Sequence, residues 1–194
     1  MTPAQTADWI ITLYLKHGNA DYIGEPVSQL EHMCQCAQRA ETSGADDEMI
    51  LAAFFHDIGH LYEHYTQKDA LYMDGYGTVD HEKLGADFVR KSGFSERIAK
   101  LVGSHVDAKR YLTATDAAYY GKLSKASKET LRMQGGFMTP NEIETFEADP
   151  LHRAYIQLRL WDEQAKETEV PIPDLKKYHE IIIRQLTKNS HATN

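Results

Sequence analysis

Two histidines and an aspartate interrupt one of the most apolar stretches of the chain. The stretch AAFFHDIGHLY, residues 52–62, places His56, Asp57 and His60 among alanine, phenylalanine, isoleucine and leucine. Burying ionisable groups is costly unless they are paired, hydrogen-bonded or bound to a metal ion. A hydrogen bond to a carbonyl group commonly explains one buried histidine. Three ionisable residues so close together indicate a metal site instead, provided that the rest of the chain supplies further ligands.

Further residues of ligand type lie on other predicted helices. Four histidines and two aspartates form the candidate ligand set: His32, His56, Asp57, His81, His105 and Asp162. Since a catalytic ion leaves coordination positions open, six protein ligands suit two ions that share a carboxylate better than one working ion. Neighbouring helical residues point about 100° apart, so His56 and Asp57 share a site only at the helix edge, or if Asp57 bridges two ions. Imidazole and carboxylate ligands without thiolate favour iron or manganese over structural zinc.

The remaining histidines have simpler interpretations. His60 lies one helical turn after His56 and is expected to contact substrate or to support a ligand. Five others lie in polar surroundings, where we expect ordinary solvated side chains: His17, His64, His152, His179 and His191. Any one candidate ligand could likewise be a satisfied core histidine or a surface carboxylate. The whole set would then require several unrelated coincidences, so the metal site is favoured.

Composition predicts one domain spanning residues 1–194, with its core over 5–188 and a disordered tail at 189–194. The chain has 194 residues, enough to bury a single core, and no apolar run approaches the roughly 18 to 20 residues that span a bilayer. A net charge of -8 without a basic block argues against nucleic acid as a partner.

Cys34 and Cys36 face different directions on a helix, which favours free thiols in a reducing cytoplasm.

Nearly every segment is predicted to be helical, and no alternating strand pattern is present. We therefore expect an all-α domain of about eight helices. Ser28 and Glu31 form a capping box before His32, and Thr78 and Ser95 are predicted to begin the helices that carry His81 and His105.

Two segments rich in glycine and tyrosine, 17–27 and 69–79, are predicted loops of the kind that carry binding residues.

Two cations share helix faces with candidate ligands. Lys109 lies four residues after His105, and Arg159 lies three residues before Asp162. A protein with net charge -8 repels anions overall, so binding an anionic substrate requires local cations of this kind. Each could also be an ordinary surface charge, but their shared facing favours a role at the metal site.

The ligand pattern resembles that of the HD-domain superfamily. HDIGH, with His32 upstream and Asp162 downstream, carries the resemblance, and His81 and His105 resemble the extra ligands of its dinuclear branch. Beyond the ligands, three segments are very similar to organophosphonate oxygenases of the PhnZ/TmpB type: DYIGEPVSQLEH, GYGTVDHEKLGADFVRKSGFSERIAKLVGSHVDAKRY and LRMQGG. The likeness covers residues 19–183.

The resemblance implies an all-α HD fold around a mixed-valent Fe(II)/Fe(III) pair. With O2, this pair would cleave the C–P bond of a 1-hydroxyphosphonate and release phosphate and a carboxylic acid. One iron would be held by His32, His56, Asp57 and Asp162, and the other by His81 and His105 with Asp57 as bridge. A 2-oxoglutarate-dependent hydroxylase would act beforehand and make the substrate.

The resemblance also assigns residues to the substrate. Tyr22 and Glu25 match a mobile loop in which the tyrosine occupies the second iron before substrate arrives and the glutamate contacts the substrate amine. Further matches line the phosphonate and substrate pocket: His60, Lys109, Ser127, Gln134 and Arg159.

The identity of the amine is a separate prediction. Glu25 favours a cationic substituent, and four tyrosines lie between His60 and His81: Tyr62, Tyr65, Tyr72 and Tyr76. Aromatic faces are the usual site for a quaternary ammonium group. The pattern therefore favours 1-hydroxy-2-(trimethylammonio)ethylphosphonate, giving glycine betaine, over the primary amine, giving glycine, unless these tyrosines only pack a loop.

Two other functions could use the same residues. A metal-dependent HD phosphohydrolase would activate water against a nucleotide or phosphate ester. A non-catalytic HD module would be a sensor or interaction domain, and such modules typically lack ligands. The complete ligand set and the DYIGE loop favour the oxygenase over both.

Overall fold

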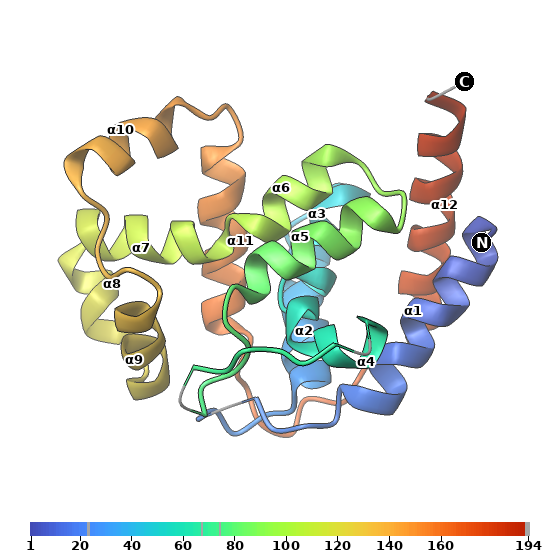
Figure 1. Ribbon diagram of the computed structural model, residues 1–194, viewed down its shortest axis with the longest axis horizontal. Coiled ribbons are helices and arrows are strands. Elements are labelled where there is room, and N and C mark those ends of the chain that lie inside the picture. Colours follow the sequence, from blue (N-terminus) through green and yellow to red (C-terminus); the bar gives the residue numbers. More distant parts are fainter. Residues whose placement is uncertain (23, 67, 74, 193–194) are drawn as a thin grey trace.

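The structure, a computed structural model, describes residues 1–22, 24–66, 68–73 and 75–192. Over these residues it is all-α, as predicted, with isolated bridges at Asp21–Ser28 and Tyr72–Thr78 in place of strands (Figure 1). The helices are α1 Pro3–His17, α2 Gln29–Thr42, α3 Asp47–Phe55, η1 (a 3-10 helix) Ile58–Leu61, α4 Tyr62–Thr66, α5 His81–Lys91, α6 Glu96–Gly103, α7 His105–Thr115, α8 Ala117–Lys122, α9 Lys125–Met133, α10 Pro140–Ala148, α11 His152–Gln164 and α12 Lys176–Ala192. None of these described helices is long and apolar enough to span a membrane.

The described chain has more helices than the eight predicted. The helix expected to run on from Ser95 breaks at Ser104, whose backbone at φ -107 and ψ -1 separates α6 from α7. Two short helices, α4 and α8, form where no helix was expected. α12 continues to Ala192, so the prediction of a disordered tail is wrong for 189–192, whereas 193–194 lie outside the described residues.

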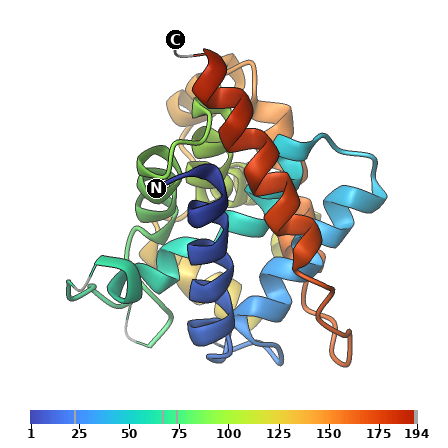
Figure 2. The ribbon, with the colours of Figure 1, turned by 90° about the vertical axis from the view of Figure 1, so that its right-hand side faces the viewer.

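α3 lies at the centre of the fold, and the two ends of the chain pack against it. The ring of Phe54 on α3 stacks with Tyr14 of α1 at 4.5 Å and with Tyr178 of α12 at 4.4 Å. The Tyr14 hydroxyl also donates to the Phe54 carbonyl oxygen at 2.6 Å. α1 and α12 consequently lie side by side (Figures 1 and 2), and every residue of α3 from Met49 to Phe55 is buried.

The stretch that contains HDIGH was predicted to be one helix, and the structure shows that it is broken. α3 ends at Phe55, and Asp57 has φ -103 and ψ 10, which is outside the α-helical range. η1 then begins at Ile58. His56 keeps helical backbone angles, φ -55 and ψ -36, and the chain departs from them at Asp57, so the two adjacent side chains can serve one centre at the end of α3.

The other candidate ligands also lie near helix ends. His32 follows the capping box of α2, in which the Ser28 and Glu31 side chains accept from each other's backbone N–H, as predicted. His81 and His105 are the first residues of α5 and α7. Thr78 was predicted to cap α5, but Asp80 precedes the helix instead, with a left-handed φ of 55.

Gly59 allows η1 to pack directly against the start of α5. A Cβ atom built on Gly59 would lie 1.9 Å from the His81 carbonyl oxygen, which is far inside van der Waals contact. Only glycine fits this close approach of two backbones. The spacing between Asp57 and His81 therefore depends on Gly59.

We expect Gly59→Ala to lower the free energy of unfolding by about 1–3 kcal/mol, because the added methyl group must push two backbones apart. Urea unfolding of the chelator-treated protein, followed by circular dichroism, measures this. Gly121→Ala is the matched control, since a Cβ there meets nothing within 4 Å and lies in helix α8. A Gly59→Ala variant as stable as the control would contradict this packing.

Candidate metal centre

A first group of donor atoms converges on one buried point. Nε2 of His32 lies 3.0 Å from Nε2 of His56 and 3.2 Å from Oδ1 of Asp162. Oδ2 of Asp57 lies 3.5 Å from the His32 nitrogen and 3.4 Å from the His56 nitrogen. All four residues are buried. Helices α2 and α11 and the end of α3 thus supply one site.

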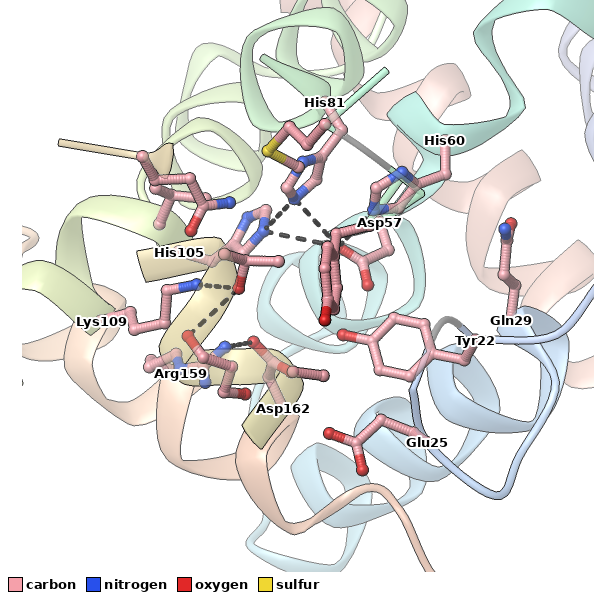
Figure 3. Close-up of a pocket in the computed structure, with 17 residues that line it drawn as sticks. Tyr22, Glu25, Gln29, Asp57, His60, His81, His105, Lys109, Arg159 and Asp162 are labelled. Carbon is pink, nitrogen blue, oxygen red and sulfur yellow. Dashed lines mark hydrogen bonds and ion pairs between the residues drawn. The ribbon is translucent and has the colours of Figure 1, made fainter. Parts of the chain in front are cut away.

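A second group uses the other oxygen of the same carboxylate. Nε2 of His81 and Nε2 of His105 lie 3.0 Å apart, and each is 3.4 Å from Oδ1 of Asp57 (Figure 3). The starts of α5 and α7 supply these two histidines. Asp57 therefore presents one oxygen to each group, which is the arrangement of a bridging ligand.

The four ligand histidines share one protonation pattern. In each, Nδ1 lies beside a backbone carbonyl oxygen that fixes the proton there: His32 with Ala165 at 2.8 Å, His56 with Ala53 at 2.8 Å, His105 with Val102 at 2.8 Å and His81 with Thr78 at 3.3 Å. Nε2 then carries a lone pair. In both groups, two lone pairs face each other at 3.0 Å. Such acceptor pairs repel unless a cation lies between them.

Two buried carboxylate oxygens also indicate that cations belong in this site. Oδ2 of Asp57 and Oδ1 of Asp162 are buried and have no hydrogen-bond partner in the described chain, and both face the first group. Burial alone would raise the pKa of Asp57, but His56, His105 and His81 hold it well below its usual value. Ionised oxygens without partners are costly to bury, so this donor set fits metal ions.

The types of donor atom indicate which metal ions the site would prefer. Imidazole and carboxylate donors suit iron or manganese. The nearby thiol of Cys36 is fully buried, and burial raises its pKa, so it remains a thiol and adds no thiolate ligand. The six expected histidine and aspartate donors thus lie together, while their role as ligands, and that of Tyr22, stays a prediction.

His60 has the opposite protonation pattern. Its Nδ1 accepts the backbone N–H of Thr78 at 3.1 Å, so its proton lies on Nε2. That Nε2 is 4.0 Å from Oδ1 of Asp57, and the ring stacks on His81 at 4.1 Å. Burial and the neighbouring His81 lower the pKa of His60 to about 3, so the ring is neutral. His60 can consequently donate a hydrogen bond beside the second group, although its donor atom also lies within 4.8 Å of those of Asp57 and His81.

One pocket opens onto the second group. Asp57, His81, His105 and Asp162 line it, whereas His32 and His56 are fully buried and are not among its lining residues. It also brings together every residue that was matched to substrate binding: Tyr22, Glu25, His60, Lys109, Ser127, Gln134 and Arg159 (Figure 3). The structure shows their proximity, while their roles stay predictions.

Lys109 and Arg159 differ in their availability to a ligand. Nζ of Lys109 is buried and donates to Oγ1 of Thr130 at 3.0 Å, which leaves further ammonium hydrogens to donate. Each guanidinium nitrogen of Arg159 already has a partner: Nε donates to the Tyr119 hydroxyl at 2.8 Å, and the two terminal nitrogens pair with Asp162 and Glu163. The guanidinium holds Oδ2 of Asp162, which leaves Oδ1 for the metal. These contacts favour a positioning role for Arg159, and its predicted contact with the phosphonate stays a prediction.

Tyr22 covers the first group. Its ring stacks on His32 at 4.0 Å, and its hydroxyl points into the pocket (Figure 3). The hydrogen bonds Tyr22 N–H to Val27 and Glu25 N–H to Tyr22, both 2.9 Å, shape the turn that carries it. Whether the hydroxyl reaches the second metal stays a prediction.

The sequence left open whether four further tyrosines hold an ammonium group or only pack a loop, and only Tyr76 of the four lines the pocket. Tyr76 lines the pocket, but Tyr65 packs on Phe88 of α5 at 4.8 Å, with Tyr62 against its edge. Tyr72 is 57% exposed and donates to Glu63. The unforeseen helix α4 directs Tyr65 toward α5, so these contacts favour packing over an ammonium site.

Sequence analysis missed Lys166. Its Nζ lies 3.0 Å from Oε1 of Glu25 and 3.1 Å from Oε1 of Glu163. The residue follows α11 in the polar run DEQAKET, where nothing distinguishes it from a surface lysine. Only the fold brings it to Glu25.

Comparisons with known proteins are consistent with this site. The HD domain profile matches residues 30–154. A hydroxymethylphosphonate dioxygenase of Gimesia maris is 40% identical over 180 residues, which cover 92% of this chain and 87% of that protein. A glycine-betaine-forming 1-hydroxy-2-(trimethylamino)ethylphosphonate dioxygenase of Leisingera caerulea is 36% identical over 186 residues, 95% of this chain and 92% of that protein. An uncharacterized protein of Acanthamoeba polyphaga mimivirus is 40% identical over 187 residues, 96% of this chain and 84% of that protein.

We expect the protein to bind about two irons per chain after anaerobic reconstitution, and Asp57→Asn to bind at most one, because the amide nitrogen cannot replace the second bridging oxygen. Iron analysis and the metal-dependent rise in melting temperature measure this. His179→Gln is the control, since His179 pairs with Asp8 at the surface. Full iron content in folded Asp57→Asn would contradict the bridge.

Proposed function

The chain belongs to the HD-domain family, in its branch of PhnZ-type oxygenases, and from this premise we propose that it uses O2 to cleave the C–P bond of a 1-hydroxyphosphonate. The bridging geometry of Asp57 is the observation that carries the proposal, because it provides for two ions in one pocket. The reaction balances with one O2: the C–P bond breaks, C1 becomes a carboxylic acid, phosphorus leaves as phosphate, and each product gains one oxygen atom.

The two groups of donor atoms have different roles in this proposal. Irons in both sites, in a mixed-valent Fe(II)/Fe(III) pair, would supply Lewis acidity and the redox equivalents for O2. His32, His56, Asp162 and Asp57 would hold the more deeply buried iron. At the site that faces the pocket, His81 and His105 supply few ligands. Coordination positions there would stay open for the hydroxyl and phosphonate oxygens of the substrate.

The chain's own residues then bind and orient the substrate. Lys109 donates to the phosphonate from within the pocket and offsets the repulsion that a chain of net charge -8 exerts on an anion. The neutral His60 donates from Nε2 beside the second site. Ser127 and Gln134 line the same pocket and add polar contacts. Tyr22 covers the pocket until substrate displaces it.

The 1-hydroxyphosphonate group is common to the names of both dioxygenase relatives, which differ in the substituent at C1. With an ammonium-bearing substituent the products would be phosphate and glycine betaine or glycine. A 2-oxoglutarate-dependent hydroxylase would be a fitting source of the 1-hydroxyl group.

We expect iron-loaded protein to release inorganic phosphate from hydroxymethylphosphonate or 1-hydroxy-2-(trimethylammonio)ethylphosphonate under air, with none under argon, because O2 is a reactant. ³¹P NMR measures the phosphate released under air and under argon. Phosphate at equal rates under argon would contradict the oxygenase and favour a hydrolase. Manganese-loaded protein is the control, and we expect it to be inactive.

We expect Lys109→Met to raise KM about 10- to 100-fold, as for the loss of a hydrogen bond to a charged group. Burial, and then the charge of Arg159, lowers the pKa of Lys109 to about 7. The protonated fraction therefore falls above pH 7, and the wild-type KM should rise there.

Lys109→Arg keeps its charge at every pH tested and should abolish this rise. Steady-state phosphate release from pH 6 to about 9 measures it. An identical rise in KM for Lys109→Arg would assign the titration to another group. Lys100→Met, at an exposed lysine paired with Asp149, is the matched control for KM.

A further inference from the structure

The Nδ1 hydrogen bond of His32 differs in origin from those of the other three candidate ligand histidines. His56, His81 and His105 each place Nδ1 against the carbonyl oxygen of the residue three positions earlier in the chain. Their orientation is therefore fixed by their own turn of backbone. The acceptor for His32 is Ala165, which is 133 residues away in the sequence and lies at 2.8 Å. A remote acceptor orients the ring only if another contact holds the remote segment in place.

The segment that carries Ala165 begins where α11 ends. Ala165 has φ -89 and ψ 46, outside the helical range, and its N–H donates to the Asp162 carbonyl oxygen at 3.1 Å. Residues 162–165 thus form one turn. This turn presents Oδ1 of Asp162 to Nε2 of His32, at 3.2 Å, and the Ala165 carbonyl oxygen to Nδ1 of the same ring. Both nitrogens of the His32 ring consequently depend on where this turn lies.

Gln35 fixes the chain just after this turn against α2. Its Nε2 donates to the Glu167 carbonyl oxygen at 2.8 Å, and its Oε1 accepts the Glu167 N–H at 3.0 Å. The side-chain amide therefore binds both main-chain groups of one residue. Gln35 is 5% exposed and lies three positions after His32, on the same face of α2. One face of α2 thus carries both the ring and the contact that places its acceptor.

Arg39, one turn further along α2, contacts the same segment but is a weaker anchor. Its guanidinium pairs with the Glu167 side chain at 2.6 Å, and the two side chains are 30% and 65% exposed. Water and salt screen an exposed pair of this kind, so it contributes little. The buried amide of Gln35 is the contact that holds the segment.

We propose that Gln35 is a positioning residue for the first group of donor atoms and acts on the metal through His32. By binding Glu167, it keeps the carbonyl oxygen of Ala165 on Nδ1 of the ring, which directs Nε2 toward the ion. Acceptors of this kind fix the tautomer of a ligand histidine and increase its basicity, and their loss typically weakens metal binding about 10- to 100-fold. The inference goes beyond the proposed function, because it concerns metal binding whether or not a C–P bond is cleaved.

Iron affinity tests the inference without turnover. Fe(II) is titrated into the full-length metal-free protein under argon, in competition with a chromogenic chelator. Gln35→Met replaces the amide with an apolar side chain of similar length. We expect it to weaken the tighter of the two iron sites, the one with four protein donors, about 10- to 100-fold. Gln38→Met, in the same helix and without these contacts, is the matched control and should bind iron like the wild type.

Proton exchange of the histidine rings shows which donor is affected. In the Zn(II)-loaded protein, which is diamagnetic, NMR of ¹⁵N-labelled histidine follows the exchange of each Nδ1–H with solvent. We expect the His32 proton to exchange at least about tenfold faster in Gln35→Met than in the wild type. The His105 proton, held by Val102 within its own turn, should be unchanged and serves as the internal reference. A loss of overall stability would instead accelerate both.

Three results would overturn the inference. The first is unchanged iron affinity in Gln35→Met that circular dichroism shows to be folded, and the second is equal acceleration of the His32 and His105 protons. The third needs no variant: the Glu167 N–H lies outside the helices and must exchange slowly in the wild type because it donates to Gln35, so rapid exchange would contradict the bond. The expected loss of iron affinity, without phosphate release by the wild type under air, would support the positioning by Gln35 and overturn the oxygenase alone.

Discussion

The carboxylate of Asp57, shared between two pairs of histidines, is the interaction on which the site depends. One oxygen faces His32 and His56, and the other faces His81 and His105, at 3.4 to 3.5 Å in every case. A buried anion in this position is costly unless cations surround it. Two features of the backbone permit the arrangement. The helix breaks after Phe55, and Gly59 lets η1 approach the start of α5.

A second layer of contacts holds the donors in place. Backbone carbonyl groups fix the Nδ1 protons of all four histidines, and Arg159 holds one oxygen of Asp162. Glu25 connects the loop before α2 to Ser124 and to Lys166. The pocket wall, the metal ligands and the end of α11 therefore form one connected polar network.

The convergence of the six candidate donors could be predicted from the sequence because residues of the right chemistry appear at spacings that fit helices. The capping box at Ser28 and Glu31 was predictable for the same reason, since it is a local pattern. The break after Phe55 and the one at Ser104 were not, because apolar periodicity continues across both. Long-range pairs such as Lys166 with Glu25, 141 residues apart in the chain, leave no local pattern. The role of the four tyrosines between His60 and His81 stayed open, because composition alone does not give the direction of a side chain.

Anomalous X-ray scattering from crystals of the iron-loaded protein, recorded at the iron absorption edge, tests the bridging role of Asp57 most directly. The account predicts two iron peaks, one on each side of the Asp57 carboxylate, with His32, His56 and Asp162 around the first and His81 and His105 around the second. A single peak, or a second iron held without Asp57, would contradict it.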